Sequence, residues 1–472
     1  MNKSDAYHLK YHITPPYGLL NDPNGLAFFK HQYHVFYQWN PKGTEHRNKC
    51  WGHVVSSDLV HWQRKSVALE PSEWYDKDGI YSGGAIVHQE KLYLFYTGNV
   101  IRDDGVKESY QCAAISEDGE HFQKMGPLFE HPKGYTRHVR DPKVWRDRNG
   151  NWWLIVGAQR EDLTGDTLIY KSTDLSVWEC QGSFLEHDRE FGYMWECPDL
   201  LHFAENDIFV FSPQGLPEAG EYYRNPNQSG YMVGKFMDTG KFNGNLAHFK
   251  ELDRGFDFYA PQSFKVNDRT IMFGWMSGMN EEAERAVPTI QEGWIHALTL
   301  PREIVLSNGV LYQKPLPELQ WLRLDGEHSQ KDIHKNGVWL LPSLQVECIV
   351  HFSKLTENFK MIIRNAVEIN YDSAENSITV WRTNWLTNQR EYRKATLANQ
   401  LADMQIFIES SSLEIFLNEG EEVFTLRYFL EDTEQRSVVL EAGDNEGKIE
   451  IYQLQECDVI INPQNDMSIF HL

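Results

Sequence analysis

Ser57-Asp58-Leu59-Val60-His61-Trp62 returns in altered form along the first half of the chain. The related stretches are Glu117-Asp118-Gly119-Glu120-His121-Phe122, Thr173-Asp174-Leu175-Ser176-Val177-Trp178 and, more loosely, Met237-Asp238-Thr239-Gly240-Lys241-Phe242. Their aspartates lie about 60 residues apart. Each aspartate fits an Asx turn that closes a hairpin, with the aromatic side chain packed beneath it. We therefore interpret these aspartates as structural, and not as metal or acid sites.

Strand-like runs fill the space between these copies. The runs are short, rich in aromatic and β-branched residues, and interrupted by Gly, Asn, Asp or Pro. Pro23, Pro142, Pro198 and Pro261 open units in the same phase, and Ser82-Gly83-Gly84 takes the equivalent place in the second unit. A repeat of about 60 residues with four strands per unit predicts a β-propeller. Five units fit between about Tyr11 and Leu311.

The repeat stops after residue 311. Residues 312–325 contain Pro315 and Pro317 and are predicted to form a linker. From residue 326 to residue 472, strand-like runs alternate with acidic turns, and two antiparallel layers would accommodate them. The sequence thus predicts an all-β protein, with a five-bladed β-propeller over residues 1–311 and a C-terminal β-sandwich over residues 326–472.

Composition narrows the classes of function. The net charge of −23 argues against nucleic acid as a partner, because neutralising phosphates requires basic patches. The six cysteines form no C-x-x-C pair and no zinc-like cluster, so they are expected to be reduced. The sequence has no signal-like apolar region and no window that could span a membrane. We expect a cytoplasmic protein, and the sequence leaves its oligomeric state open.

Three acidic residues stand next to a proline in the same phase of the repeat. They are Asp22 before Pro23, Asp141 before Pro142, and Glu196 two places before Pro198. Taken alone, Asp-Pro and Asn-Gly indicate turns. In a propeller, however, the first strand of each blade lines the central channel. Acids at the starts of the first strands in units one, three and four would therefore meet at one channel mouth.

Six ordered motifs resemble those of glycoside hydrolase family 32, which contains invertases, sucrose-6-phosphate hydrolases and fructan hydrolases. They are Asn21-Asp22-Pro23-Asn24-Gly25, Phe36-Tyr37-Gln38, Trp51-Gly52-His53, Tyr81-Ser82-Gly83, Arg140-Asp141-Pro142 and Glu196-Cys197-Pro198. The stretch Ser412-Leu413-Glu414-Ile415-Phe416-Leu417-Asn418 resembles the β-sandwich domain of the family. The resemblance implies a retaining β-fructofuranosidase that acts on sucrose or sucrose 6-phosphate. No metal or organic cofactor is expected, because a carboxylate pair suffices for this reaction.

The resemblance also implies roles for individual residues. Asp22 would be the nucleophile, Glu196 the general acid/base, and Asp141 the residue that holds the ring hydroxyls of fructose. Glu196 must carry a proton, and Trp195 and Cys197 would either lower the polarity around it or simply pack in the strand. The residues expected to contact the substrate are Asn21, Gln38, Tyr81, Ser82, Arg140 and Trp275. An ion pair with Asp141 is the alternative for Arg140, and core packing is the alternative for Trp275.

A basic cluster is expected at the rim of the channel. The connection between the second and third strands of a blade returns to the catalytic face, and in the first unit this connection carries Arg47 and Lys49. The segment that enters the third unit brings Arg137 and His138 to the same rim. In a chain of net charge −23, this cluster predicts a subsite for a phosphate or leaving group. A solvated loop that balances nearby acids is the alternative. Many relatives carry a Trp in the loop before Trp51-Gly52-His53, and residues 42–49 contain none.

Two other functions compete with sucrose hydrolysis. One is an exo-acting fructan hydrolase or a fructosyltransferase, which would use the same fructosyl-enzyme. The other is a non-catalytic sugar-binding propeller, which would be marked by the loss of one of the three acids. All three acids are present in this chain.

Overall fold

The computed structural model describes residues 5–186, 191–333 and 336–461, which form an almost entirely β-stranded protein. The first sheet has the order β20 (Trp294–Ile295), β1 (Gly18–Phe29), β2 (Gln32–Asn40), β3 (Cys50–Ser56), β4 (Gln63–Arg64) and β35 (Ile460–Ile461). The second contains β5 (Ile80–His88), β6 (Lys91–Ile101), β7 (Lys107–Ser116) and β8 (Gln123–Glu130). The third contains β9 (Tyr135–Arg146), β10 (Trp152–Arg160), β11 (Gly165–Ser172) and β12 (Glu179–Ser183).

Two further sheets complete this part of the molecule. The fourth contains β13 (Met194–His202), β14 (Asp207–Gln214), β15 (Gly230–Met237), β16 (Lys241–Asn243) and β17 (Lys250–Glu251). The fifth contains β18 (Tyr259–Val266), β19 (Arg269–Trp275), β21 (Arg302–Ser307) and β22 (Val310–Pro315). Between β19 and β21, the chain forms the short helices α1 (Glu281–Arg285) and η3 (Pro288–Glu292), and η2 (Leu246–His248) lies between β16 and β17.

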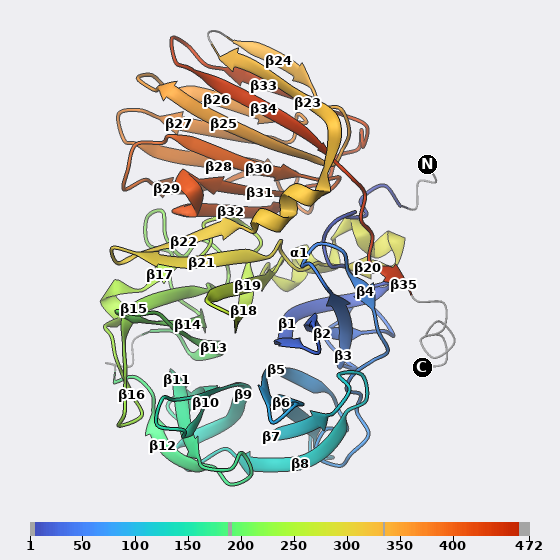
Figure 1. Cartoon of the computed structure of the whole chain (residues 1–472), viewed down its shortest axis with the longest axis vertical. Coiled ribbons are helices and arrows are strands. Elements are labelled where there is room, and N and C mark those ends of the chain that lie inside the picture. Colours follow the sequence, from blue (N-terminus) through green and yellow to red (C-terminus); the bar gives the residue numbers. More distant parts are fainter. Residues whose placement is uncertain (1–4, 187–190, 334–335, 462–472) are drawn as a thin grey trace.

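The five sheets surround a common centre (Figure 1), with β1, β5, β9, β13 and β18 innermost. Each of these strands contacts the next, and β18 contacts β1, so the ring is closed. The repeated turns are Asx turns as predicted: Asp58, Asp118 and Asp174 each accept backbone N–H bonds from the residues two and three positions later. These contacts, together with the buried rings of Trp62 and Trp178, confirm the structural interpretation of the repeat.

A β-bulge recurs in all five innermost strands. The pairing with the second strand shifts by one residue between Leu20 and Pro23, Tyr81 and Gly83, Arg140 and Lys143, Glu196 and Asp199, and Tyr259 and Gln262. The sequence predicts the acids at the starts of the innermost strands. The structure instead places them within these strands. The reason is that the strands begin before the acids, β1 at Gly18, β9 at Tyr135 and β13 at Met194. A bulge redirects side chains that would otherwise alternate between the two faces of a sheet.

The C-terminal part is a sandwich of two antiparallel sheets. One sheet has the order β23 (Arg323–Ile333), β34 (Glu446–Leu454), β25 (Val346–Lys354), β30 (Asp403–Ile408), β31 (Ser412–Leu417) and β32 (Glu422–Arg427). The other has the order β24 (Gly337–Leu340), β33 (Ser437–Glu441), β26 (Phe359–Ile363), β27 (Val367–Asp372), β28 (Ser377–Thr383) and β29 (Arg390–Thr396). One hydrophobic core lies between them, and the 3-10 turn η5 (Asn418–Gly420) joins β31 to β32. An all-β propeller followed by a sandwich is thus confirmed.

The connection between the two parts is shorter than the linker predicted over residues 312–325. Its first residues belong to β22, and β23 begins at Arg323, so the intervening segment is mainly the 3-10 helix η4 (Pro317–Leu322). At the other end of the chain, β35 leaves the sandwich and pairs in parallel with β4 of the first sheet. A buried ion pair also joins the two parts, because Arg302 of β21 binds Glu414 of β31 at 2.7 Å.

Candidate active site

The bulges arrange side chains in two tiers around the channel. We call the residues that precede each bulged position the outer tier, namely Asn21, Tyr81, Arg140, Glu196 and Tyr259. All five line one cavity of about 870 Å³. The residues that follow them form the inner tier, namely Asp22, Ser82, Asp141, Cys197 and Ala260. Three of these, Asp141, Cys197 and Ala260, have left-handed φ values of 70°, 45° and 48°, which are uncommon for residues other than glycine.

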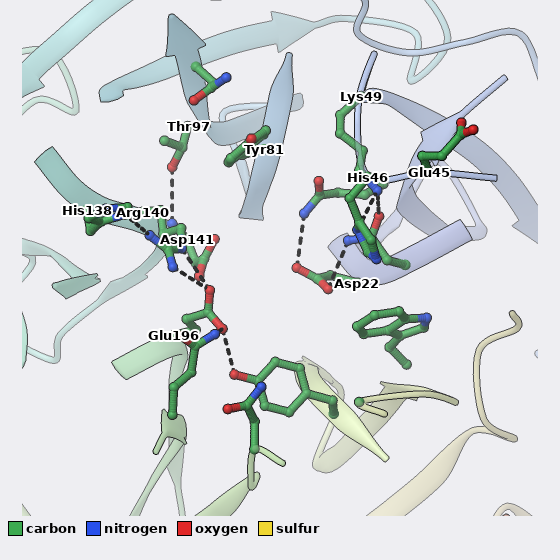
Figure 2. A pocket seen from close by; sticks show the side chains of 18 of the residues that line it. Asp22, Glu45, His46, Lys49, Tyr81, Thr97, His138, Arg140, Asp141 and Glu196 are labelled. Carbon is green, nitrogen blue, oxygen red and sulfur yellow. Dashed lines mark hydrogen bonds and ion pairs between the residues drawn. The ribbon is translucent and has the colours of Figure 1, made fainter. Parts of the chain in front are cut away.

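Neutral hydrogen-bond donors hold Asp22 at the floor of the cavity. Asn21 Nδ2 donates to its Oδ1 at 3.1 Å, and Gln38 Nε2 donates to its Oδ2 at 3.0 Å. Ser82 Oγ also donates to Oδ2. Ser82 is fully buried and is not among the described residues that line the cavity, so it lies behind the carboxylate. The Asp22 side chain points into the open space (Figure 2).

Asp141 is buried at the centre of the three carboxylates. The backbone N–H of Cys197 donates to its Oδ2 at 2.9 Å, and the Cys197 thiol lies 3.5 Å from Oδ2 and 3.8 Å from Asp22 Oδ2. Burial, and next the negative charge of Glu196, raise the pKa of Asp141 to about 7. Of the two neighbours of Glu196, Cys197 therefore contacts the carboxylates. Trp195 instead packs on Phe211, away from the cavity.

Both oxygens of Glu196 accept hydrogen bonds. Arg140 donates to Oε1 from Nε at 2.8 Å and from Nη2 at 2.7 Å, so its guanidinium binds Glu196 and not the neighbouring Asp141. Gln214 Nε2 and Tyr259 OH each donate to Oε2 at 2.6 Å. These contacts fix the carboxyl group on the opposite side of the cavity from Asp22 (Figure 2).

Another part of the cavity wall is formed by residues of the first sheet together with the segment that follows β19. Trp275 lies edge-on to His46 and His296, and its buried Nε1 has no hydrogen-bond partner among the described residues. Trp275 itself lines the cavity, and a buried indole N–H usually has a hydrogen-bond partner. Glu284 of α1 binds His46 Nε2 at 3.0 Å and His296 Nε2 at 2.8 Å. The structure thus places Trp275 in the wall of the cavity.

The predicted basic rim is only partly assembled. Arg137 and His138 line the cavity, and Lys107 and Arg285, which the sequence did not single out, line it too. Lys49 lines it but is buried, so it lies in the wall and not at the rim. Arg47 is not among the described residues that line the cavity. It is exposed and forms an ion pair with Glu45 at 3.4 Å, because the connection before β3 turns its side chain toward solvent.

Sequence reasoning missed several residues that contact the carboxylates. Tyr259 holds Glu196 from the fifth sheet, Gln214 holds it from β14, and Thr97 Oγ1 accepts the backbone N–H of Asp141 at 3.1 Å. A signal for Tyr259 was present, because Tyr259-Ala260-Pro261 repeats the phase of Glu196-Cys197-Pro198. Nothing in the local sequence marks Gln214 or Thr97.

Replacing Asp141 with Asn is expected to raise thermal stability at pH 8. Because the folded-state pKa lies above the ordinary carboxyl value, the wild type loses stability as pH rises from about 4 to about 7. The ionised group therefore costs on the order of 2–4 kcal/mol above that range. An amide oxygen can still accept the N–H of Cys197. Melting curves of both proteins at pH 8 and pH 4 should show a gain in Tm that is largest at pH 8. A gain that does not depend on pH would contradict this account.

The fold and the cavity together define a class of protein. Carboxyl groups that face each other across an open, polar cavity are the arrangement used by glycoside hydrolases. The described residues contain no group of three or more His, Cys, Asp or Glu that could hold a metal ion. No helix in the described part of the chain is long and apolar enough to cross a membrane.

Comparison with known proteins identifies the family. Residues 12–315 match the N-terminal domain of glycosyl hydrolases family 32, and residues 318–456 match its C-terminal domain. The chain is 43% identical over 437 residues to a sucrose-6-phosphate hydrolase of Bacillus subtilis, with 90% of each chain covered. It therefore belongs to glycosyl hydrolase family 32 and is a glycoside hydrolase.

Solved structures of similar proteins agree with this assignment. A sucrose-6-phosphate hydrolase from Lactobacillus gasseri has a TM-score of 0.88 and 29% identity, with 96% of this chain and 95% of that chain covered. A β-fructofuranosidase mutant from Bombyx mori, solved in complex with sucrose, has a TM-score of 0.86 and 32% identity, with 97% and 95% covered.

Proposed function

We propose that the protein is a retaining β-fructofuranosidase that hydrolyses sucrose and sucrose 6-phosphate. The observation that carries the proposal is that Asp22 and Glu196 face one cavity from different strands and have different partners. Asp22 is surrounded by neutral donors and is open to the cavity. Glu196 is fixed by Arg140, Gln214 and Tyr259.

In the first half of the reaction, an Asp22 oxygen attacks the anomeric carbon of the fructosyl unit. The bond from that carbon to the bridging oxygen breaks, and the proton of Glu196 passes to the departing glucosyl oxygen. In the second half, Glu196 takes a proton from water as the water attacks the fructosyl ester, and Asp22 is released. Asp141 and the Trp275 indole N–H would hold hydroxyls of the sugar.

Retention of configuration is the direct consequence of this mechanism. Two displacements at the anomeric carbon restore its original stereochemistry, so β-fructofuranose should be the first product. NMR spectra recorded in the first minutes of sucrose hydrolysis, before mutarotation, will show which anomer appears first. The α-anomer as first product would require an inverting water and would remove Asp22 from the role of nucleophile.

Sucrose 6-phosphate is proposed to be the better of the two substrates. Support comes from the cations at the cavity rim, Lys107, Arg137 and Arg285, in a chain of net charge −23. The similarity to sucrose-6-phosphate hydrolases points the same way. A cytoplasmic location belongs to this proposal, because a phosphorylated sugar is made and used inside the cell.

Replacing Arg137 with Ala is expected to lower the ratio of kcat/KM for sucrose 6-phosphate to that for sucrose by about tenfold. One charge-assisted hydrogen bond to a partly exposed phosphate accounts for an effect of this size. Arg47→Ala is the matched control, because Arg47 is exposed and is not among the described residues that line the cavity, although its partner Glu45 is. Inulin should be assayed alongside, since faster release of fructose from inulin would favour a fructan hydrolase. A wild type that strongly prefers unphosphorylated sucrose would rule out the phosphate subsite.

A further inference from the structure

Lys49 is a buried cation that the mechanism above does not use. It lies at the end of the connection before β3, only 3% exposed, and its side chain reaches the wall of the cavity. Burial lowers the pKa of Lys49 to about 7, although Asp22 and Glu284 oppose the shift. Burying an ammonium group is costly, so its contacts need an explanation.

Lys49 is the middle of a hydrogen-bonded chain that ends on Asp22. Lys49 Nζ contacts Asn21 Oδ1, and Asn21 Nδ2 donates to Asp22 Oδ1 at 3.1 Å. On the other side, Lys49 Nζ lies 3.2 Å from His46 Nδ1, and His46 Nε2 lies 3.0 Å from Glu284 Oε1. The chain therefore runs from Glu284 of α1 to Asp22, and Figure 2 shows its members His46, Lys49 and Asp22.

The chemistry of each group fixes the direction of this chain. In its protonated form Lys49 can only donate, so Asn21 Oδ1 and His46 Nδ1 accept from it. The hydrogen of His46 is then on Nε2, where it is donated to the Glu284 carboxylate. Because the oxygen of the Asn21 amide is held by Lys49, its NH₂ group is left facing Asp22. Without Lys49, the amide oxygen loses its donor, and only the hydrogen bond to Asp22 still holds the amide in place.

We propose that Lys49 is a positioning residue that sets the orientation of the Asn21 amide and, through it, aims Asp22 at the anomeric carbon. This inference rests on the proposed role of Asp22 as nucleophile. Lys49 acts on the enzyme side of the reaction, so its contribution does not depend on which group leaves.

Replacing Lys49 with Met removes the charge and the donors while keeping the length of the side chain. The expected result is a 10- to 100-fold lower kcat, the effect of losing one hydrogen bond to a charged group. The loss should be the same for sucrose and for an aryl β-fructofuranoside, and KM should change little. Lys42→Met is the matched control, since Lys42 is exposed in the same connection. A loss confined to sucrose would show that Lys49 binds the leaving group and would overturn the proposal.

A double-mutant cycle with Asn21 tests the route through the amide. If Lys49 acts through Asn21, then Asn21→Ala/Lys49→Met should be no slower than Asn21→Ala alone, within about threefold. Effects that multiply would overturn the proposal. If Lys49→Met does not fold, as judged by its melting curve, Lys49→Gln replaces it in both experiments. Full activity of Lys49→Met beside an inactive Asp22→Asn would reject this inference alone. An active Asp22→Asn would reject the proposed nucleophile.

Discussion

Replacing Asp22 with Asn is expected to abolish turnover of sucrose while leaving the fold intact. Loss of a covalent nucleophile costs on the order of 10⁴-fold in kcat. The asparagine would keep an oxygen that accepts from Gln38 and Ser82, so little stability should be lost. The measurements are kcat on sucrose and the melting temperature of both proteins.

Asp118→Asn is the matched control for this variant. Asp118 accepts two backbone N–H bonds in an exposed turn, and an asparagine oxygen can accept them as well. The control should therefore remain fully active. A folded Asp22→Asn protein with near-normal activity would remove Asp22 from the chemistry, whatever the control shows.

Replacing Glu196 with Gln is expected to lower kcat on sucrose by about 10²- to 10⁴-fold, the usual contribution of a general acid. The loss should be much smaller for formation of the fructosyl-enzyme from an aryl β-fructofuranoside, because that leaving group departs without a proton. Added azide should then speed release of the fructosyl group, since it attacks without a general base. A burst assay with and without azide measures both steps. An equal loss on the two substrates would contradict the role of proton donor.

Much of the fold could be predicted because its signals are local. The Asx turns and the prolines recur at a fixed phase, which is enough to recognise a propeller and to place Asp22, Asp141 and Glu196 near one another. The resemblance to a known family supplied their roles. The sequence does not mark the edge strand β23, because most of its residues are exposed and polar and carry no alternating pattern.

The rest of the site depends on three-dimensional contacts that leave no local mark. Lys49 follows a polar, basic stretch and was expected at the rim, yet the start of β3 pulls it into the wall of the cavity. Arg47, two residues earlier, turns toward solvent. Tyr259 is not an acid, so the pattern of acidic residues before prolines does not mark it.

The repeated bulge gives the inner tier five corresponding positions, one in each innermost strand. These positions carry a carboxylate, a hydroxyl, a second carboxylate, a thiol and a methyl group, at Asp22, Ser82, Asp141, Cys197 and Ala260. The path of the backbone at each position is set by the strand pairing and not by the side chain at that position. A substitution at one of these positions should therefore change the group that it carries while leaving the strand pairing in place. The chemical groups around the channel could thus change in evolution one position at a time, on an unchanged ring of strands.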